Sequence, residues 1–278
     1  MKIERILLST DCSEFSSGAE REAINIAKRF NAGLYILSVI ETNPEFTALA
    51  PQILEKVEEK ARRYLEDLRI RAEKEGLKAE IIIHEGEGPH KFIIDEASKR
   101  DCNIIAMGRR GRKGLMKLMM GSQTARTIGH SSVDVLVVPR KARIEFKNIV
   151  IATDASAFSE KAAERAIQIA KQTGATLFAI AVTRPDATAE RLKESEDALL
   201  RIRTACQKEG VKVETEHVRN RPHEKIYEAI IEFSKKHNAD LIVVGSHGRT
   251  GISRLLMGSV AERVIGHAES AVLVVKGG

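Results

Sequence analysis

The amino-acid sequence predicts an α/β protein built from two tandem doubly wound, Rossmann-like units, each an open five-stranded parallel sheet with helices on both faces. Three observations favour this fold class. Short apolar segments alternate with segments of helical periodicity in the order β-α-β-α-β-α-β-α-β, which is typical of a parallel sheet. The same order starts again near Lys147. A loop bracketed by glycines also occurs once in each half, with the same spacing.

The first half begins with an apolar strand, Ile3–Ser9, that ends at Thr10 and Asp11. Alanines and isoleucines then recur at helical spacing between Ser16 and Asn31, a residue that tolerates the left-handed conformation of a helix end. In chain order, the remaining expected elements are a strand over residues 34–40, a helix over 53–74, a strand over 79–84, a helix that starts at Pro89, a strand over 104–107, a helix that starts near Ser122 and a strand over 133–138.

The second half repeats this order from Lys147, which indicates a duplication. Matching residues keep similar offsets: 154 − 11 = 143 for two aspartates, 210 − 76 = 134 and 245 − 108 = 137 for two pairs of glycines, and 222 − 89 = 133 for two prolines. Residues 1–143 and 144–278 are therefore expected to form two domains, with residues 140–145 as the only linker. A pseudo-twofold intramolecular dimer is the expected architecture.

Composition narrows the class of protein. A chain of 278 residues, 43% hydrophobic and 30% charged, has room for two average domains with their own cores. No apolar run approaches the roughly 20 residues of a membrane span, and the first residues lack a signal peptide's apolar region, so we expect a cytoplasmic protein without a membrane partner. The net charge of +6 is mixed with acidic residues, which argues against nucleic acid. Three cysteines without a CxxC motif argue against disulfides or a thiolate metal site.

The duplicated loop has the pattern G-x2-G-x9-G-S and is the main candidate for a binding site. Its members are Gly108, Gly111, Gly121 and Ser122 in the first half, and Gly245, Gly248, Gly258 and Ser259 in the second. The first glycine of each copy ends a buried strand, where we expect a turn at positive φ, and each serine is expected to be the N-cap of a helix. The helix N-terminus would then face a phosphate chain. The alternative is that the glycines only interrupt two loops and the serines only cap two helices.

These features together resemble the universal stress protein family in its tandem form, over essentially the whole chain. The residues that carry the resemblance are the two glycine loops and the segments STDCSEFS (residues 9–16) and ATDASAFS (residues 152–159), each at the end of a first strand. Both halves resemble the ATP-binding branch of that family. The resemblance implies an adenine nucleotide, ATP, ADP or AMP, as the ligand of each half, and it allows Mg2+ to accompany the phosphates.

The resemblance also implies roles for single residues. Asp11 and Asp154 would lie near the ribose, and Val39 and Val182 would contact adenine through their backbone. The residues implied at the phosphates are the glycines and serines of the two loops together with Arg109, Gln123 and Val260. The chain departs from the family after each aspartate, where Cys12 and Ala155 replace the usual glycine, and before the third helices, where Glu87 and Asn220 stand in place of glycine.

Basic residues distinguish the two loops. The first carries Arg109, Arg110, Arg112, Lys113 and Lys117, whereas the second carries Arg249, Arg254 and His247. We therefore expect the first site to bind more phosphates, or to bind them more tightly. The alternative is a basic loop that is simply solvated.

Three histidine pairs recur at matching places. His130 and His267 are expected at helix ends, where a cation is favoured by the helix dipole, and His90 and His223 at helix starts near the pocket; the third pair is His84 and His217. The spacing of the histidines argues against a metal site.

No sequence signature of an enzyme is present: there is no Walker A motif, no GxSxG and no carboxylate pair beside the loops. The favoured function is a nucleotide-binding stress-response or signalling module with an unknown protein partner. A slow ATP hydrolase or phosphotransferase, and an interaction protein that binds no nucleotide, remain alternatives. The last strands, near residues 133–138 and 270–275, resemble the segments that pair across dimers in the family, which also allows a homodimer.

Overall fold

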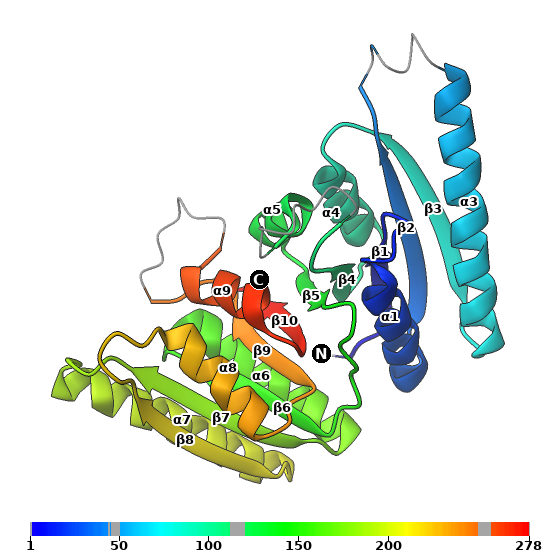
Figure 1. Ribbon diagram of the computed structural model, residues 1–278. Coiled ribbons are helices and arrows are strands. Elements are labelled where there is room, and N and C mark those ends of the chain that lie inside the picture. Colours follow the sequence, from blue (N-terminus) through cyan, green and yellow to red (C-terminus); the bar gives the residue numbers. More distant parts are fainter. Residues whose placement is uncertain (1, 44, 46–50, 112–119, 250–256, 278) are drawn as a thin grey trace. The chain divides into compact units, whose positions relative to one another are not determined.

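The computed structural model describes residues 2–43, 45, 51–111, 120–249 and 257–277. They form two compact units, Lys2–Lys141 and Ala142–Gly278 (Figure 1). Each unit contains a parallel sheet of five strands, which confirms the predicted fold class. Among the residues described, no helix combines the length and the apolar character that crossing a membrane requires.

The first unit is doubly wound. Its strand order is β3-β2-β1-β4-β5, so the chain moves outward from β1 in one direction and then from β4 in the other. Right-handed crossovers therefore place α1 and α3 on one face of the sheet and α4 and α5 on the other. The elements are β1 (Arg5–Ser9), α1 (Ser17–Phe30), β2 (Gly33–Glu41), α3 (Pro51–Lys74), β3 (Ala79–Gly86), α4 (Pro89–Lys99), β4 (Ile104–Gly108), α5 (Ser122–His130) and β5 (Asp134–Val138).

The second unit has the same topology. Its strand order, β10-β9-β6-β7-β8, corresponds strand for strand to that of the first unit. The elements are β6 (Asn148–Thr153), α6 (Ala157–Thr173), β7 (Thr176–Thr183), α7 (Ala189–Glu209), β8 (Val213–Arg219), α8 (Ile226–Lys236), β9 (Leu241–Gly245), α9 (Ser259–His267) and β10 (Ala271–Val275).

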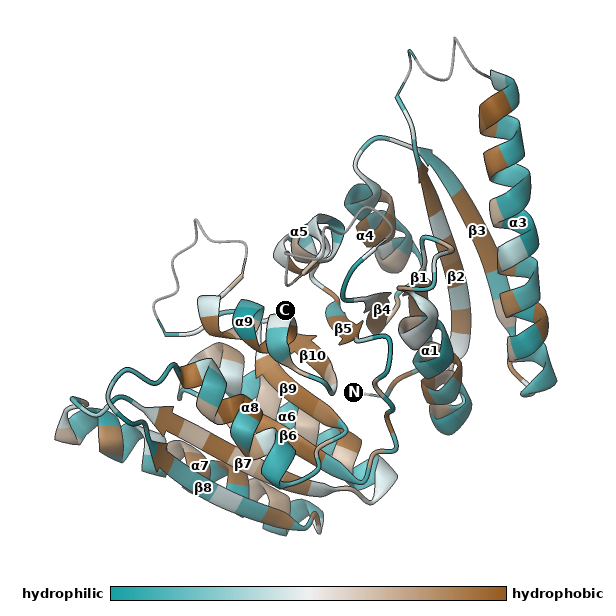
Figure 2. Ribbon diagram, in the orientation of Figure 1, coloured by the Kyte–Doolittle hydropathy of each residue, from teal (hydrophilic) through white to brown (hydrophobic). Residues whose placement is uncertain are grey.

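The core of each unit lies on both faces of its sheet. Every residue of β5 and β10 is buried, as are Ile104–Gly108 in β4, because helices cover both sides. Figure 2 shows the matching colour pattern, with β9 and β10 mainly hydrophobic and the long helix α3 mainly hydrophilic. On α3 only a narrow stripe is buried: Leu54, Ala61, Leu65, Leu68 and Ala72.

The long helices α3 and α7 have the same register relative to their sheets. Counted back from the glycines that end them, Gly76 and Gly210, an offset of 210 − 76 = 134 relates their residues. At this offset four buried positions of α3 (61, 65, 68 and 72) coincide with four buried positions of α7 (195, 199, 202 and 206). Corresponding positions of the two helices can therefore be compared directly.

Most predicted helix ends are confirmed. Asn31 has the left-handed conformation expected of a helix end, with φ 52°, and Pro89 is the first residue of α4. One predicted start is wrong: α8 begins at Ile226, not at Pro222. The chain makes a turn there, since His223 has φ 70° and the Lys225 N–H, which precedes the helix, donates to Glu228 Oε2 at 2.9 Å.

Each first strand is tied to the segment before its glycine strand. In the first unit Asn103 Oδ1 accepts the N–H groups of Glu4 (2.7 Å) and Arg5 (3.0 Å). In the second, the Asp240 carboxylate accepts those of Phe146 (3.1 Å) and Lys147 (2.8 Å). These contacts fix the amino-terminal ends of β1 beside β4 and of β6 beside β9, opposite the carboxyl ends at which the candidate sites lie.

Candidate functional site

In each unit the candidate site lies where the strand order reverses. Asp11 follows β1 and Gly108 ends β4, and these two strands are neighbours in the sheet. Asp154 and Gly245 have the same relation at the ends of β6 and β9. In open α/β sheets ligands bind at the carboxyl ends of the strands at this reversal point. The structure therefore brings the predicted aspartates and glycines together at the place where this fold provides a crevice.

The first glycine of each loop is needed for close packing, and the prediction of a positive φ there is wrong. Neither Gly108 nor Gly245 has a positive φ. A Cβ on Gly108 would lie 3.0 Å from the Phe15 carbonyl oxygen, and a Cβ on Gly245 would lie 2.9 Å from the Phe158 carbonyl carbon. Because backbone atoms cannot move aside easily, only glycine allows the start of α1 or α6 to approach these strand ends.

The second glycine of each loop packs against the aspartate. A Cβ on Gly111 would lie 3.0 Å from Asp11 Oδ2, and a Cβ on Gly248 would lie 2.7 Å from Asp154 Oδ2. In the second unit the N–H of Arg249 donates to Asp154 Oδ2 at 3.0 Å. The aspartate thus holds the glycine loop by a backbone hydrogen bond.

The third glycine, not the serine, is the N-cap of the following helix. Gly121 (φ −71°, ψ 147°) and Gly258 (φ −66°, ψ 138°) are the caps, and Ser122 and Ser259 are the first helical residues, so the predicted caps are wrong by one position. Each cap glycine is fixed because its N–H donates at 2.9 Å to a carbonyl of the loop, Arg109 or Ser246 respectively.

The helices that begin at these glycines have no side-chain hydrogen bond at their N-caps, as far as the described residues show. By contrast, Ser156 caps α6 by accepting from the Ser159 N–H at 3.2 Å, and Thr188 caps α7 by accepting from the Arg191 N–H at 3.2 Å. The first-turn N–H groups of α5 and α9 have no partner within their helices. With the positive end of the helix dipole, they form an arrangement suited to an anion.

The turn after each aspartate takes an uncommon backbone conformation. Cys12 (φ 57°) and Ala155 (φ 61°) are left-handed, although neither is glycine. Each N–H donates to the threonine hydroxyl two residues earlier, Thr10 at 3.0 Å and Thr153 at 3.2 Å. These residues therefore keep the backbone path that glycine would adopt easily, at a strain of about 1 kcal/mol or more.

Hydrogen bonds fix the orientation of the aspartates. Asp11 Oδ1 accepts from the hydroxyls of Ser13 (2.6 Å) and Ser16 (2.8 Å). Asp154 Oδ1 accepts from the Ser156 N–H at 3.1 Å. A carboxylate held in this way at the edge of the sheet is suited to sugar hydroxyls or to a cation, whereas it would repel a phosphate.

A buried carboxylate near Asp11 was not predicted from the sequence. Glu20, 2% exposed, accepts from the hydroxyls of Thr10 (2.6 Å) and Tyr64 (3.0 Å). Burial raises the pKa of Glu20, and burial followed by the nearby Glu20 charge raises the pKa of Tyr64. In the second unit the corresponding residue is Ala163 (163 − 20 = 143). The sequence contained a signal for this buried carboxylate, because Glu20 lies beside the apolar stripe of its helix.

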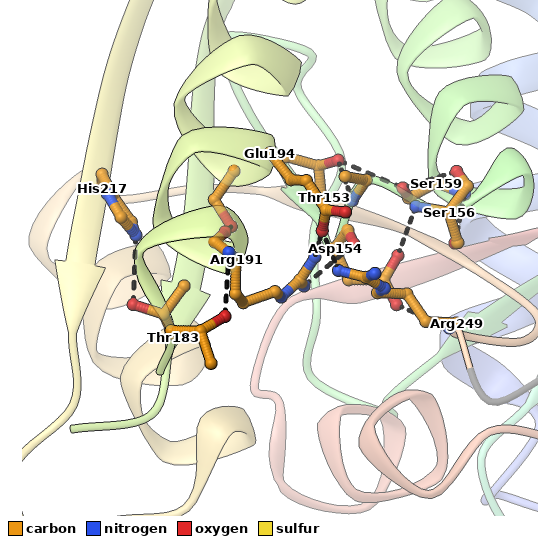
Figure 3. Close-up of polar contacts among 12 residues, drawn as sticks. Thr153, Asp154, Ser156, Ser159, Thr183, Arg191, Glu194, His217 and Arg249 are labelled. Carbon is orange, nitrogen blue, oxygen red and sulfur yellow. Dashed lines mark hydrogen bonds and ion pairs between the residues drawn. The ribbon is translucent and has the colours of Figure 1, made fainter. Parts of the chain in front are cut away.

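The valines predicted at the adenine lie in the second strands of the two sheets. Val39 is in β2 and Val182 is in β7, 8% exposed. The next residue after Val182, Thr183, makes a 3.1 Å hydrogen bond with Nε2 of His217 from the neighbouring strand (Figure 3). Contact between these valines and a base stays a prediction.

The histidines near the loops differ between the units. In the first, the Gln123 side-chain oxygen lies 3.3 Å from both the N–H and Nδ1 of His90, and burial lowers the pKa of His90. In the second, His223 lies in the turn before α8, and so the prediction of a helix start is wrong. His130 and His267 end α5 and α9 as predicted. Within the described ranges no cluster of three potential metal ligands occurs.

Part of the predicted basic loop can be placed. Arg109 is half-buried, and burial followed by the neighbouring Arg110 lowers the pKa of its guanidinium. The corresponding residue of the second unit is Ser246, which is fully buried (246 − 109 = 137). Arg112, Lys113, Lys117 and Arg254 lie outside the described residues.

In the second unit α7 also reaches the loop. The Glu194 carboxylate forms ion pairs with Arg249 of the loop and with Arg191 of its own helix, the latter at 3.2 Å (Figure 3). Arg191 additionally donates from Nη2 to the Asp154 carbonyl oxygen at 2.9 Å. We call Arg191, Glu194 and Arg249 the arginine–glutamate cluster.

Comparison with known proteins identifies the family to which this architecture belongs. The model of the universal stress protein family matches residues 2–139 and again residues 145–276. The chain belongs to the universal stress protein family. Because the family model matches each half separately, the predicted tandem duplication is confirmed.

Individual universal stress proteins agree with this assignment. One from Methanocaldococcus jannaschii is 42% identical over 144 residues, covering 47% of this chain and 82% of the relative. One from Mycolicibacterium smegmatis is 29% identical over 98% of this chain and 96% of the relative. Among solved structures, a universal stress protein from Archaeoglobus fulgidus matches with a TM-score of 0.81 at 26% identity, with 100% of both chains covered. The similarity therefore extends over both halves.

Proposed function

We propose that each half of this universal stress protein binds one adenine nucleotide, with the phosphates at the N-terminus of α5 or α9. The observation that carries the proposal is the repeated arrangement at the strand-order reversal. There, a helix without a side-chain cap begins at Gly121 or Gly258, and the preceding loop is packed against Asp11 or Asp154. Two copies of one anion-binding geometry in one chain favour two sites of the same kind.

The described residues fit the parts of a nucleotide. First-turn N–H groups of α5, including that of Gln123, and of α9, including that of Val260, suit the phosphates. Asp11 and Asp154 suit ribose hydroxyls or a Mg2+ ion that accompanies the phosphates. In this proposal occupancy fixes the loop conformation and thereby favours or disfavours a protein partner, which makes the chain a stress-response or signalling module.

The proposal is tested by placing a negative charge where the phosphate should lie. Gly121→Asp and Gly258→Asp suit this purpose, because both glycines have ordinary φ and ψ and a Cβ there would have no neighbour closer than 3.4 Å. Aspartate is also a favourable N-cap, so each helix should persist. Its carboxylate, however, occupies the first-turn N–H groups and repels phosphate. The matched controls are Gly121→Asn and Gly258→Asn, which have the same shape without the charge.

Calorimetric titration of the nucleotide-stripped chain with Mg-ATP measures the result. We expect two sites with micromolar affinity, about −8 kcal/mol each. Each aspartate variant should lose one site. Each asparagine variant should keep two, because its neutral amide oxygen can cap the same N–H groups but does not repel the phosphate that displaces it. Absence of heat in the unsubstituted chain, or two intact sites in both aspartate variants, would contradict the proposal.

A further inference from the structure

The arginine–glutamate cluster lies directly beside the second candidate site. Arg249 follows the second loop glycine, and its own N–H donates to Asp154 Oδ2 at 3.0 Å. Its guanidinium is paired with Oε2 of Glu194. The loop is thus attached at two points, to the Asp154 turn by its backbone and to α7 by its side chain (Figure 3).

Glu194 has the environment of a bound anion. A single carboxylate oxygen, Oε2, pairs with two guanidinium groups from different elements, Arg191 on α7 and Arg249 on the loop. Hydrogen bonds from Arg249 and then Arg191 lower the pKa of Glu194. Two arginines around one oxygen are also the arrangement that recognises a phosphate oxygen.

The cluster is accessible enough to exchange partners. The side chains of Glu194 and Arg249 are 37% and 42% exposed. Ion pairs of this exposure are weak and are screened by salt. A triphosphate carries several charges and therefore can displace a single carboxylate from these arginines.

The first unit cannot form the same cluster. At the offset of 134 that relates α3 to α7, Val57 corresponds to Arg191 and Lys60 to Glu194. The coincidence of four buried positions at this offset shows that these residues occupy equivalent places on the two helices. The two α7 residues of the cluster therefore have no counterpart at the equivalent positions of α3.

We propose that Glu194 is an internal competitor for the phosphate groups of the ligand at the second site, and that Arg249 and Arg191 bind those phosphates once Glu194 is displaced. The inference rests on the proposed nucleotide function. Binding exchanges the Glu194 carboxylate for ligand phosphate, while the Arg191 contact to the Asp154 carbonyl oxygen keeps that arginine at the site. Glu194 therefore sets the affinity of the second site and makes it depend on the number of phosphates.

Glu194→Gln tests this in the full chain. The first site is removed by Gly121→Asp, so that calorimetry reports the second site alone. Glutamine keeps the size of the side chain and removes its charge. Because partly exposed ion pairs are weak, we expect ATP to bind about three- to tenfold more tightly at low salt. The gain should shrink at 0.5 M salt, since screening weakens the wild-type ion pairs. Adenosine, which has no phosphate, should show no gain, whereas inorganic tripolyphosphate should show it.

Two controls separate a specific competitor from a general effect of charge. Glu190→Gln removes the same charge from the same helix one turn earlier, at an exposed residue, and should leave ATP affinity within twofold. In an Arg249→Gln background Glu194→Gln should lose most of its effect, because the competition acts through that arginine.

The outcomes distinguish the two proposals. If ATP binds the Gly121→Asp chain but Glu194→Gln leaves its affinity unchanged or weaker, the competitor role is wrong and the nucleotide function stands. An undiminished gain in the Arg249→Gln background, or an equal gain from Glu190→Gln, would likewise overturn the competitor role. If neither ATP nor tripolyphosphate binds at either site, the proposed function itself fails.

Discussion

The contact between Gly248 and Asp154 allows a quantitative prediction about the second glycine loop. Gly248→Ala places a Cβ 2.7 Å from Asp154 Oδ2, closer than Cβ atoms approach other groups, so the carboxylate must rotate away. It then loses the hydrogen bond from the Arg249 N–H. Because Asp154 is only half-buried, we expect this to cost about 1–2 kcal/mol. No backbone strain adds to the cost, since φ of Gly248 is not positive.

Amide hydrogen exchange followed by NMR measures this effect at the bond that is lost. A cost of about 1–2 kcal/mol corresponds to roughly 5- to 30-fold faster exchange of the Arg249 N–H. Gly258→Ala serves as a control in the same loop, because its Cβ would have no neighbour closer than 3.4 Å, and it should leave this amide unchanged.

Removal of the Asp154 carboxylate shows whether its contact with the added Cβ causes the faster exchange. In an Asp154→Ala background the Arg249 N–H already lacks its acceptor, so Gly248→Ala should accelerate its exchange no further. If Gly248→Ala accelerates exchange equally with and without the carboxylate, or has no effect in the unsubstituted chain, the close contact is not the reason for glycine at this position.

Two further predictions concern buried groups. Tyr64→Phe removes a donor to Glu20, and urea unfolding should show a loss of about 1–2 kcal/mol near pH 7. The loss should be smaller in acid. The folded-state pKa of Glu20 is raised, so the protonated carboxyl stabilises the fold, and this contribution is lost as the pH rises through the folded pKa. Above that pKa the buried carboxylate is charged and depends most on the hydrogen bond from the Tyr64 phenol. An equal loss of stability at acid and neutral pH would contradict this account. Burial raises the pKa of Cys102 and Cys206 to about 11, so iodoacetamide at pH 8 should label Cys12, the more exposed thiol, well before either of them.

The order of helices and strands was predictable because it depends on local patterns. Buried parallel strands require continuous apolar runs, and helices against a sheet require apolar residues at helical spacing. Pro89 at a helix start and Asn31 at a helix end were equally local signals. The predicted helix start at Pro222 was wrong because proline also occurs in turns, and His223 has the left-handed conformation there.

The loop was found from its spacing, but the reason for its glycines was not. A positive φ is a local property and was the natural prediction, whereas the clashes of Gly108 with Phe15 and of Gly248 with Asp154 involve residues about 90 positions away. The arginine–glutamate cluster was missed for the same reason. Arg249 and Glu194 are 55 residues apart (249 − 194 = 55), and only the packing of α7 beside the loop makes them neighbours.

The shared register of α3 and α7 has a consequence for how a duplicated chain can diversify. The inward stripe of each helix has to match its sheet, so it leaves little freedom for change, whereas the outward positions next to the stripe carry no such constraint. Val57 and Lys60 on one helix, and Arg191 and Glu194 on the other, differ at outward positions of this kind. Under the proposed nucleotide function, two halves with the same interior can in this way acquire different ligand affinities. Sites that fill at different concentrations would make the response gradual over a wider range than two identical sites permit.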